Sequence, residues 1–210
     1  ALFGGPERLD PIPETAPVQP GSPYGESKFM IERVLHWADS IYGLRSACLR
    51  YFNAAGADPE GRAGEDHRPE THLIPLTIDA ALGRRPALKL FGTDYPTRDG
   101  SCIRDYIHVT DLADAHVRAL GQIDHRSVTY NIGNGQGYSN LAVIRSVERV
   151  SGRKVPWEAA PRRAGDPTLL VGDPTTPRTE TGWEPRFGDL DRTVENALRW
   201  RVNHTNGSAI

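Results

Sequence analysis

The chain has 210 residues, of which 38% are hydrophobic and 25% charged, an ordinary composition for a globular protein with a buried core. Its net charge of -2 gives no reason to expect nucleic acid or an anionic membrane as a partner, and no apolar run approaches the ~20 residues of a membrane span. The sequence holds two cysteines, Cys48 and Cys102, and neither a CxxC nor an HxxxH motif. We therefore expect no disulfide framework, no metal site and a reducing, cytoplasmic location.

The first third of the chain predicts a loop, a helix and a strand. Six prolines between residues 4 and 23 exclude a long helix or a central strand there. Apolar residues then recur at steps of three and four, which indicates a helix from Tyr24 that ends at Gly43. The apolar run at residues 47–52 predicts a buried strand. A helix and a strand joined by a short link are typical of an α/β fold.

The remaining elements alternate between helices and strands. Three further helices are predicted, one ending at Gly83, one beginning with Thr110 as N-cap, and one running from an N-cap at Ser139 to a C-cap at Gly152. A last helix begins after Asp189. Strands are predicted near residues 87–91, 106–109 and 128–132, and residues 204–210 are predicted to be a frayed tail.

Tyr24 and Lys28 are the first candidates for chemistry. They stand four residues apart, so on a helix both side chains lie on one face. A lysine cation close to a phenol favours the phenolate. Such a phenolate can take a proton from a sugar or alcohol hydroxyl while a hydride leaves the same carbon. The pair alone is weak evidence, because YxxxK is frequent by chance.

Several longer stretches are more specific than this pair. They read SPYGESK, LRYFNAAGA, GEDHRPETHLIP, LFGTDYPTRDGSCIRDYIHVTDLADAH, YNIGNGQGYS and PRRAGDPTLLV. In order and spacing, the chain from residue 1 to about residue 203 resembles the C-terminal two-thirds of the UDP-glucose 4-epimerase family, which are extended short-chain dehydrogenase/reductase enzymes.

The resemblance implies an α/β fold, namely the C-terminal part of a Rossmann-type NAD-binding fold plus a smaller mixed α/β substrate domain. Residues 1–55 are expected to be the remainder of the NAD-binding domain, with strands near 104–109 and 128–133 returning to it. Residues 56–103 and 134–203 are expected to bind the UDP-sugar, followed by the tail at 204–210.

The resemblance also implies roles for individual residues. Tyr24 resembles the catalytic base, Lys28 the residue that favours its phenolate and holds the nicotinamide ribose of NAD, and the backbone of Phe52 a neighbour of the nicotinamide. Arginine forks suit a diphosphate and a carboxylate suits a ribose diol. The implied substrate contacts are Asn53, Arg104 and Arg163 for the diphosphate, His72 and Leu73 for the uridine nucleotide, Lys89, Leu90 and Phe91 beside the uracil, and Asp166 for the ribose.

Some family features are missing or altered. The sequence has no GxxGxxG fingerprint, and the glycines at 133–137 predict a turn because they lack the context of a phosphate loop. The resemblance places that fingerprint and a catalytic Ser or Thr before residue 1. We therefore expect a fragment that is inactive alone and poorly soluble, with an exposed sheet edge. Phe3 stands where the family usually has Tyr, and Leu170 leaves open whether N-acetylated sugars fit.

The implied reaction interconverts UDP-glucose and UDP-galactose through a 4-keto intermediate, with transient hydride transfer to NAD, and the family implies a homodimer at full length. Two alternatives stay open: another sugar-nucleotide short-chain enzyme (a 4,6-dehydratase, or a uronate epimerase or decarboxylase), or a non-catalytic truncated product that binds a UDP-sugar weakly or nothing. His67, Arg68 and Glu70 are expected on a loop surface, and Cys102 as a packed thiol.

Overall fold

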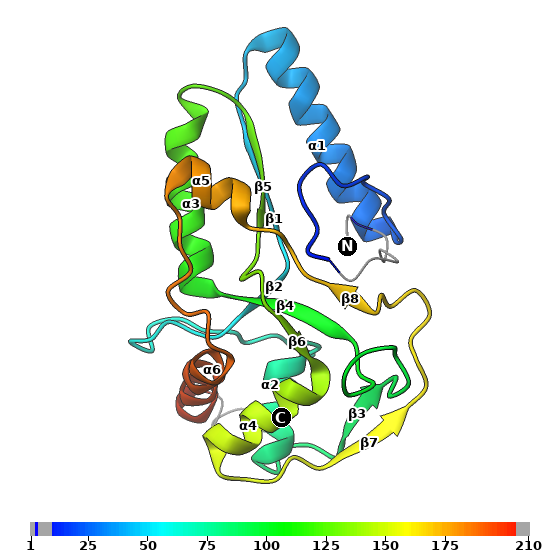
Figure 1. The fold of residues 1–210 in the computed structure, drawn as a ribbon. Helices are drawn as coiled ribbons and strands as arrows, with labels where there is room; N and C mark the ends of the chain where they lie inside the picture. Colours follow the sequence, from blue (N-terminus) through cyan, green and yellow to red (C-terminus); the bar gives the residue numbers. More distant parts are fainter. Residues whose placement is uncertain (1–2, 4–9, 205–210) are drawn as a thin grey trace.

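The computed structural model describes Phe3 and residues 10–204, which contain six helices and eight strands (Figure 1). The helices are α1 Pro23–Tyr42, α2 Leu73–Ala81, α3 Val109–Ile123, α4 Asn140–Ser151, α5 Thr175–Thr181 and α6 Leu190–His204. The strands are β1 Ala47–Tyr51, β2 Asn53–Ala55, β3 Leu88–Phe91, β4 Ile103–His108, β5 Val128–Ile132, β6 Gly137–Ser139, β7 Trp157–Ala160 and β8 Leu169–Leu170. None of the described helices combines the length and the apolar character that a transmembrane helix requires.

Helix α1 has local signals at both ends, and its prediction is confirmed. The Ser22 hydroxyl accepts a hydrogen bond from the backbone N–H of Gly25 at 3.2 Å, and Pro23 follows at the start of the helix. At the other end Gly43 adopts φ 66, the left-handed conformation in which a helix commonly ends. Gly25 is the one buried residue of this helix, so most side chains of α1 remain at least partly exposed.

The predicted strand at residues 47–52 is confirmed as β1, although it is only partly buried, and a second strand, β2, follows Phe52 with a different partner. β1 pairs in parallel with β5, from Ala47 opposite Val128 to Tyr51 opposite Ile132. β2 pairs in parallel with β4 instead. The change of partner falls at Phe52, whose backbone N–H still donates to the carbonyl of Ile132 at 3.3 Å.

Strand β4 organises the second sheet. It pairs with β2 and β8 in parallel and with β6 in an antiparallel sense (Figure 1). Three strands that lie far apart in the sequence are thereby joined in one sheet. The pairing of β4 and β8 joins Arg104 to Leu170. Helices α3 and α5 pack beside β1 and β5, where Trp183 is fully buried.

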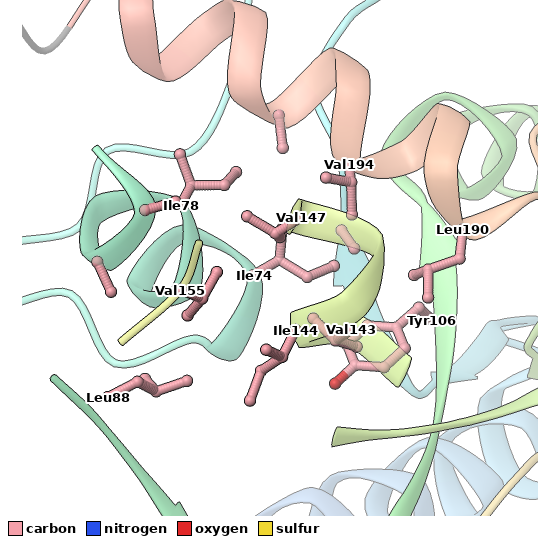
Figure 2. Close-up of a cluster of buried hydrophobic side chains, with 14 of the residues drawn as sticks. Ile74, Ile78, Leu88, Tyr106, Val143, Ile144, Val147, Val155, Leu190 and Val194 are labelled. Atoms are coloured by element: carbon pink, nitrogen blue, oxygen red, sulfur yellow. The ribbon is translucent and has the colours of Figure 1, made fainter. Parts of the chain in front are cut away.

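A second core lies below these sheets, where α2, α4 and α6 pack on one another beside the β3–β7 ribbon (Figures 1 and 2). Ile78 of α2, Val147 of α4 and Val194 of α6 are all fully buried and meet there. Truncating one such aliphatic side chain to alanine typically costs about 2–5 kcal/mol. This core fixes the start of α2 and the strand β4, which both border the candidate site.

The predicted helix ends are confirmed except at α2, which ends at Ala81 with Leu82 rather than Gly83 as its C-cap, and at the start of α3. His108, not Thr110, caps α3, because its Nδ1 accepts the N–H of Thr110 at 3.1 Å. The caps at Ser139, Gly152 and Asp189 are as predicted. Helix α6 runs to His204, the first residue of the predicted tail, and the rest of that tail lies outside the described residues. The short elements β7, β8 and α5 were not predicted.

Candidate active site

Tyr24 and Lys28 lie on one face at the start of α1, as their spacing predicts. The Lys28 Nζ atom is 5.1 Å from the centroid of the Tyr24 ring. The Tyr24 side chain is 67% exposed, so its hydroxyl is open to a ligand. The capped first turn of α1 holds this pair in place, since Ser22 and Pro23 fix where the helix begins.

Two pockets meet at Tyr24. One, of about 560 Å³, is lined among others by Lys28, Phe3 and Leu170. The other, of about 400 Å³, is lined among others by His72 and Leu73. The residues that line both pockets are Tyr24, Tyr51, Phe52 and Asn53. The structure therefore brings the two predicted catalytic residues together with four further predicted site residues.

Asn53 and Phe52 are held by the second sheet. The Asn53 Nδ2 group donates to the backbone carbonyl of Asp105 at 3.0 Å. The Phe52 ring packs against Gly172, where an added Cβ would lie 2.3 Å from the ring. Gly172 thus has to be small, because a side chain there would displace the wall of both pockets.

Asp105 is a buried anchor that the sequence analysis did not single out. Its carboxylate accepts three backbone N–H groups, from Asn134 at 2.8 Å, Gly135 at 3.1 Å and Gly172 at 3.2 Å. Burial raises the pKa of Asp105 to about 6, although these hydrogen bonds act in the opposite direction. The glycines at 133–137 therefore form a turn around a carboxylate, as predicted, rather than a phosphate loop. The local sequence IRDYIH, in which Asp105 follows Arg104, gave no signal that singled out Asp105.

Arg104 and Asp166, two of the predicted substrate contacts, bind each other. The Arg104 Nη2 atom lies 2.6 Å from Asp166 Oδ1, and its Nη1 donates to the carbonyls of Ile103 and Pro167. Neither residue lines the two pockets. Arg104 is opposite Leu170 in the pairing of β4 with β8, and Leu170 lines the pocket of about 560 Å³.

The predicted uracil segment forms strand β3, away from both pockets. Leu90 is buried in the core, so its side chain is not available to a ligand, whereas Lys89 is exposed. The Arg163 guanidinium carbon is 3.9 Å from the centroid of the Phe91 ring. Arg162 instead pairs with Asp94. The structure therefore joins Arg163 to Phe91 but does not bring them to Tyr24.

The loop before α2 is less exposed than its sequence predicts. His72 occupies the N-cap position of α2 without capping it, and its Nδ1 contacts Glu65 Oε1 instead. Glu70 is not a surface residue: its side chain is only 7% exposed, and its Oε1 accepts the backbone N–H groups of Thr71 and His72. The prediction for Glu70 was therefore wrong, because the docking of α6 onto this loop is invisible in the local sequence.

Cys102 is a packed thiol, as predicted. Its side chain is buried, and the Asn140 Nδ2 group donates to its sulfur at 3.1 Å. Burial raises the pKa of the Cys102 thiol, so the reactive thiolate is disfavoured.

Comparisons with known proteins show the family to which the chain belongs. The sequence pattern of the NAD dependent epimerase/dehydratase family matches residues 1–133. The chain is 47% identical over 209 residues to a UDP-glucose 4-epimerase of Lacticaseibacillus casei, covering 99% of this chain and 63% of that protein. It is 52% identical over 202 residues to a UDP-glucose 4-epimerase of Azospirillum brasilense, covering 95% of this chain and 58% of that protein.

Solved structures give the same result. A UDP-glucose 4-epimerase crystal structure matches with a TM-score of 0.93 at 44% identity, covering 100% of this chain and 64% of that one. The Brucella ovis UDP-glucose 4-epimerase in complex with NAD matches with a TM-score of 0.90 at 44% identity, covering 95% and 62%. The expected Rossmann-type α/β fold is confirmed, and the chain spans about three fifths of the length of these relatives. The chain belongs to the NAD dependent epimerase/dehydratase family.

Proposed function

We propose that this chain supplies the catalytic base and the UDP-sugar side of a UDP-glucose 4-epimerase. The observation that carries the proposal is the position of Tyr24 on the wall shared by two pockets, with Lys28 in one and His72 in the other. Its similarity to relatives of that name supports the substrate class.

In this proposal Tyr24 is the base. Its phenol oxygen takes the proton of the sugar 4-hydroxyl and later returns it, and the Lys28 Nζ atom lies beside it, 5.1 Å from the centroid of the Tyr24 ring. Arg104, Arg163 and Asn53 hold the diphosphate, so the 4-keto sugar can turn about that anchor and present its other face. The reaction then interconverts UDP-glucose and UDP-galactose without net redox change.

The residues present fit one end of NAD. The pocket of about 560 Å³ combines the Tyr24 hydroxyl and the Lys28 ammonium, which suit the ribose hydroxyls, with the backbone of Phe52 for the nicotinamide. NAD, when bound, supplies the acceptor and donor of hydride. The chain's own task is to hold the ribose and to move the 4-hydroxyl proton.

We extend the proposal to a cytoplasmic homodimer. Four large apolar side chains of α1 are exposed at steps of four, three and four residues, namely Met30, Val34, Trp37 and Ile41. Such a stripe suits helix-to-helix packing between two copies. The division into an NAD part at 1–55 and UDP-sugar parts at 56–103 and 134–203 belongs to the same proposal.

Ligand binding tests the proposal. Isothermal titration of the purified chain with UDP-glucose and dTDP-glucose should show tighter binding of the uridine compound. Product analysis with UDP-galactose and NAD then measures epimerisation, for which we expect no turnover by the 210-residue chain alone. Preference for dTDP-glucose would favour a 4,6-dehydratase, and absence of binding to either compound would favour a non-catalytic chain.

A further inference from the structure

Four potential metal ligands converge in the loop before α2. They are Glu65, His67, Glu70 and His72, and one donor atom of each lies within 4.8 Å of the donor atoms of the others. The sequence pattern is E-x-H-x-x-E-x-H, which differs from the HxxxH and CxxC spacings that signal most such sites. From this convergence we propose that the four residues bind one divalent transition-metal ion of the Zn²⁺ class.

The distances suit one small ion. The His67 Nδ1 atom is 2.9 Å from Glu65 Oε1 and 3.8 Å from Glu70 Oε1. Two donors on a tetrahedral zinc ion lie roughly 3.4 Å apart, which follows from metal–ligand bonds of about 2.0–2.2 Å. The observed distances fall on either side of that value. The four side chains have to move closer together to surround an ion, because their donor atoms are separated by up to 4.8 Å.

The two imidazole rings meet edge to face around the same carboxylate. The centroids of His67 and His72 are 5.0 Å apart with the planes at 80°, and both rings direct Nδ1 to Glu65 Oε1. An ion at this point would contact both Nδ1 atoms and a carboxylate oxygen. Two nitrogen and two oxygen ligands favour zinc or a similar ion over Mg²⁺, which prefers oxygen and water.

The charge around the site also favours a cation. Glu70 is nine-tenths buried, and within the described part of the chain its Oε2 accepts no hydrogen bond. The nearby cation is Arg201, whose Nη1 is 3.5 Å from Glu70 Oε2. Arg201 also forms a two-fold hydrogen-bonded pair with Asp79, so this one guanidinium group faces the three carboxylates of Asp79, Glu70 and Glu65. The carboxylates of Glu65 and Glu70 therefore leave negative charge for the ion.

The site borders the substrate pocket. Glu65 and His72 line the pocket of about 400 Å³ together with Tyr24 and Asn53. If the proposed function holds, His72 is needed by the nucleotide, so an ion that binds His72 competes with the UDP-sugar. The metal would then lower the apparent affinity for UDP-glucose, and this consequence alone rests on the proposed function.

Zinc titration tests the site. The purified 210-residue chain is titrated with ZnCl₂ by calorimetry and, after dialysis, its metal content is measured by elemental analysis. We expect one equivalent of zinc, no saturable binding of MgCl₂, and at least a tenfold loss of zinc affinity in His67→Ala. His67 is 55% exposed and lies outside the proposed substrate contacts, so its removal leaves the fold and the UDP pocket intact.

His125→Ala is the matched control, because His125 is exposed and lies after α3. Its zinc affinity should equal that of the unaltered chain, with far-ultraviolet circular dichroism of both variants unchanged. Absence of saturable zinc binding, or equal affinities of His67→Ala and His125→Ala, would overturn the site. A second titration with UDP-glucose, with and without zinc, reports on the nucleotide separately. A chain that binds zinc but never UDP-glucose would refute the proposed function and leave the metal site standing.

Discussion

Arg104 and Asp166 are 62 residues apart in the sequence and form an ion pair, with Nη2 2.6 Å from Oδ1. Arg104 also donates twice through Nη1, to the carbonyls of Ile103 and Pro167. Among the described residues, these contacts use three of the five N–H groups of an arginine, which leaves two for an anionic ligand. Arg104 was expected to contact the diphosphate and Asp166 the ribose. The structure shows that these two side chains bind each other, so a change in one also affects the other.

Asp166→Asn tests whether the carboxylate of Asp166 binds the ribose or only positions Arg104. If the carboxylate binds the ribose 2′-hydroxyl, the variant should bind UDP about tenfold more weakly, or about 1.4 kcal/mol, but should bind 2′-deoxy-UDP as the unaltered chain does. Calorimetry with both nucleotides measures this. An equal loss for both would mean that Asp166 only positions Arg104.

The neighbouring arginines Arg162 and Arg163 provide a matched pair. Arg163 lies over the ring of Phe91 with no described acidic partner, whereas Arg162 is bound to Asp94. We therefore expect Arg163→Ala to weaken UDP binding about tenfold and Arg162→Ala to change it less than threefold. Titration calorimetry with UDP compares the two. The reverse order would assign the diphosphate contact to Arg162.

Tyr24→Phe tests the proposed base. The change removes only the hydroxyl, so the fold and nucleotide binding should persist while epimerisation falls at least about 10²-fold. Turnover requires an active protein, so both forms are placed behind the segment of the Lacticaseibacillus casei relative that the chain does not cover. Tyr42→Phe, at the exposed far end of the same helix, is the control and should keep full turnover. Full activity of Tyr24→Phe would show that Tyr24 is not the catalytic base.

Structural features that depend on nearby residues could be predicted from the sequence. Helix α1 was predictable because Ser22 and Gly43 mark its ends, and the Tyr24–Lys28 pair because its spacing follows from the helix itself. The break at Phe52 was not predictable, since it depends on β5 and β4, whose partners lie far along the chain. The burial of Glu70 and the role of Asp105 depend on distant segments in the same way.

Asp105 makes stability depend on pH with a definite sign. Its pKa is about 6 in the folded chain, above the ordinary value of 3.8 for an aspartate, so folding favours the protonated form. The ionised carboxylate therefore costs stability at neutral pH, and that cost is relieved as the pH falls through 6 toward 4. We expect the free energy of unfolding to rise, relative to Asp105→Asn, by up to about 1.4 kcal/mol per pH unit in this window.

Urea unfolding of both proteins from pH 4 to 7.5 measures this difference. Asp105→Asn carries no titratable group at this position, so its stability reports the pH dependence of the other groups of the chain. A difference between the two proteins that does not change with pH would contradict the raised pKa.

The apolar stripe of α1 predicts a specific effect on association. Val34 is 66% exposed in the middle of the stripe, so a glutamate there leaves the fold intact but places a charge where two helices would pack. With the chain placed behind the segment of the Lacticaseibacillus casei relative that it does not cover, we expect a dimer, and Val34→Glu should weaken it at least about 100-fold, as measured by analytical ultracentrifugation over a range of concentrations. Val117→Glu is the control, because Val117 is 68% exposed on α3, outside the stripe, and its change should leave the dimer as it is. A monomer at every concentration, or equal effects of the two substitutions, would show that α1 is not the contact between copies.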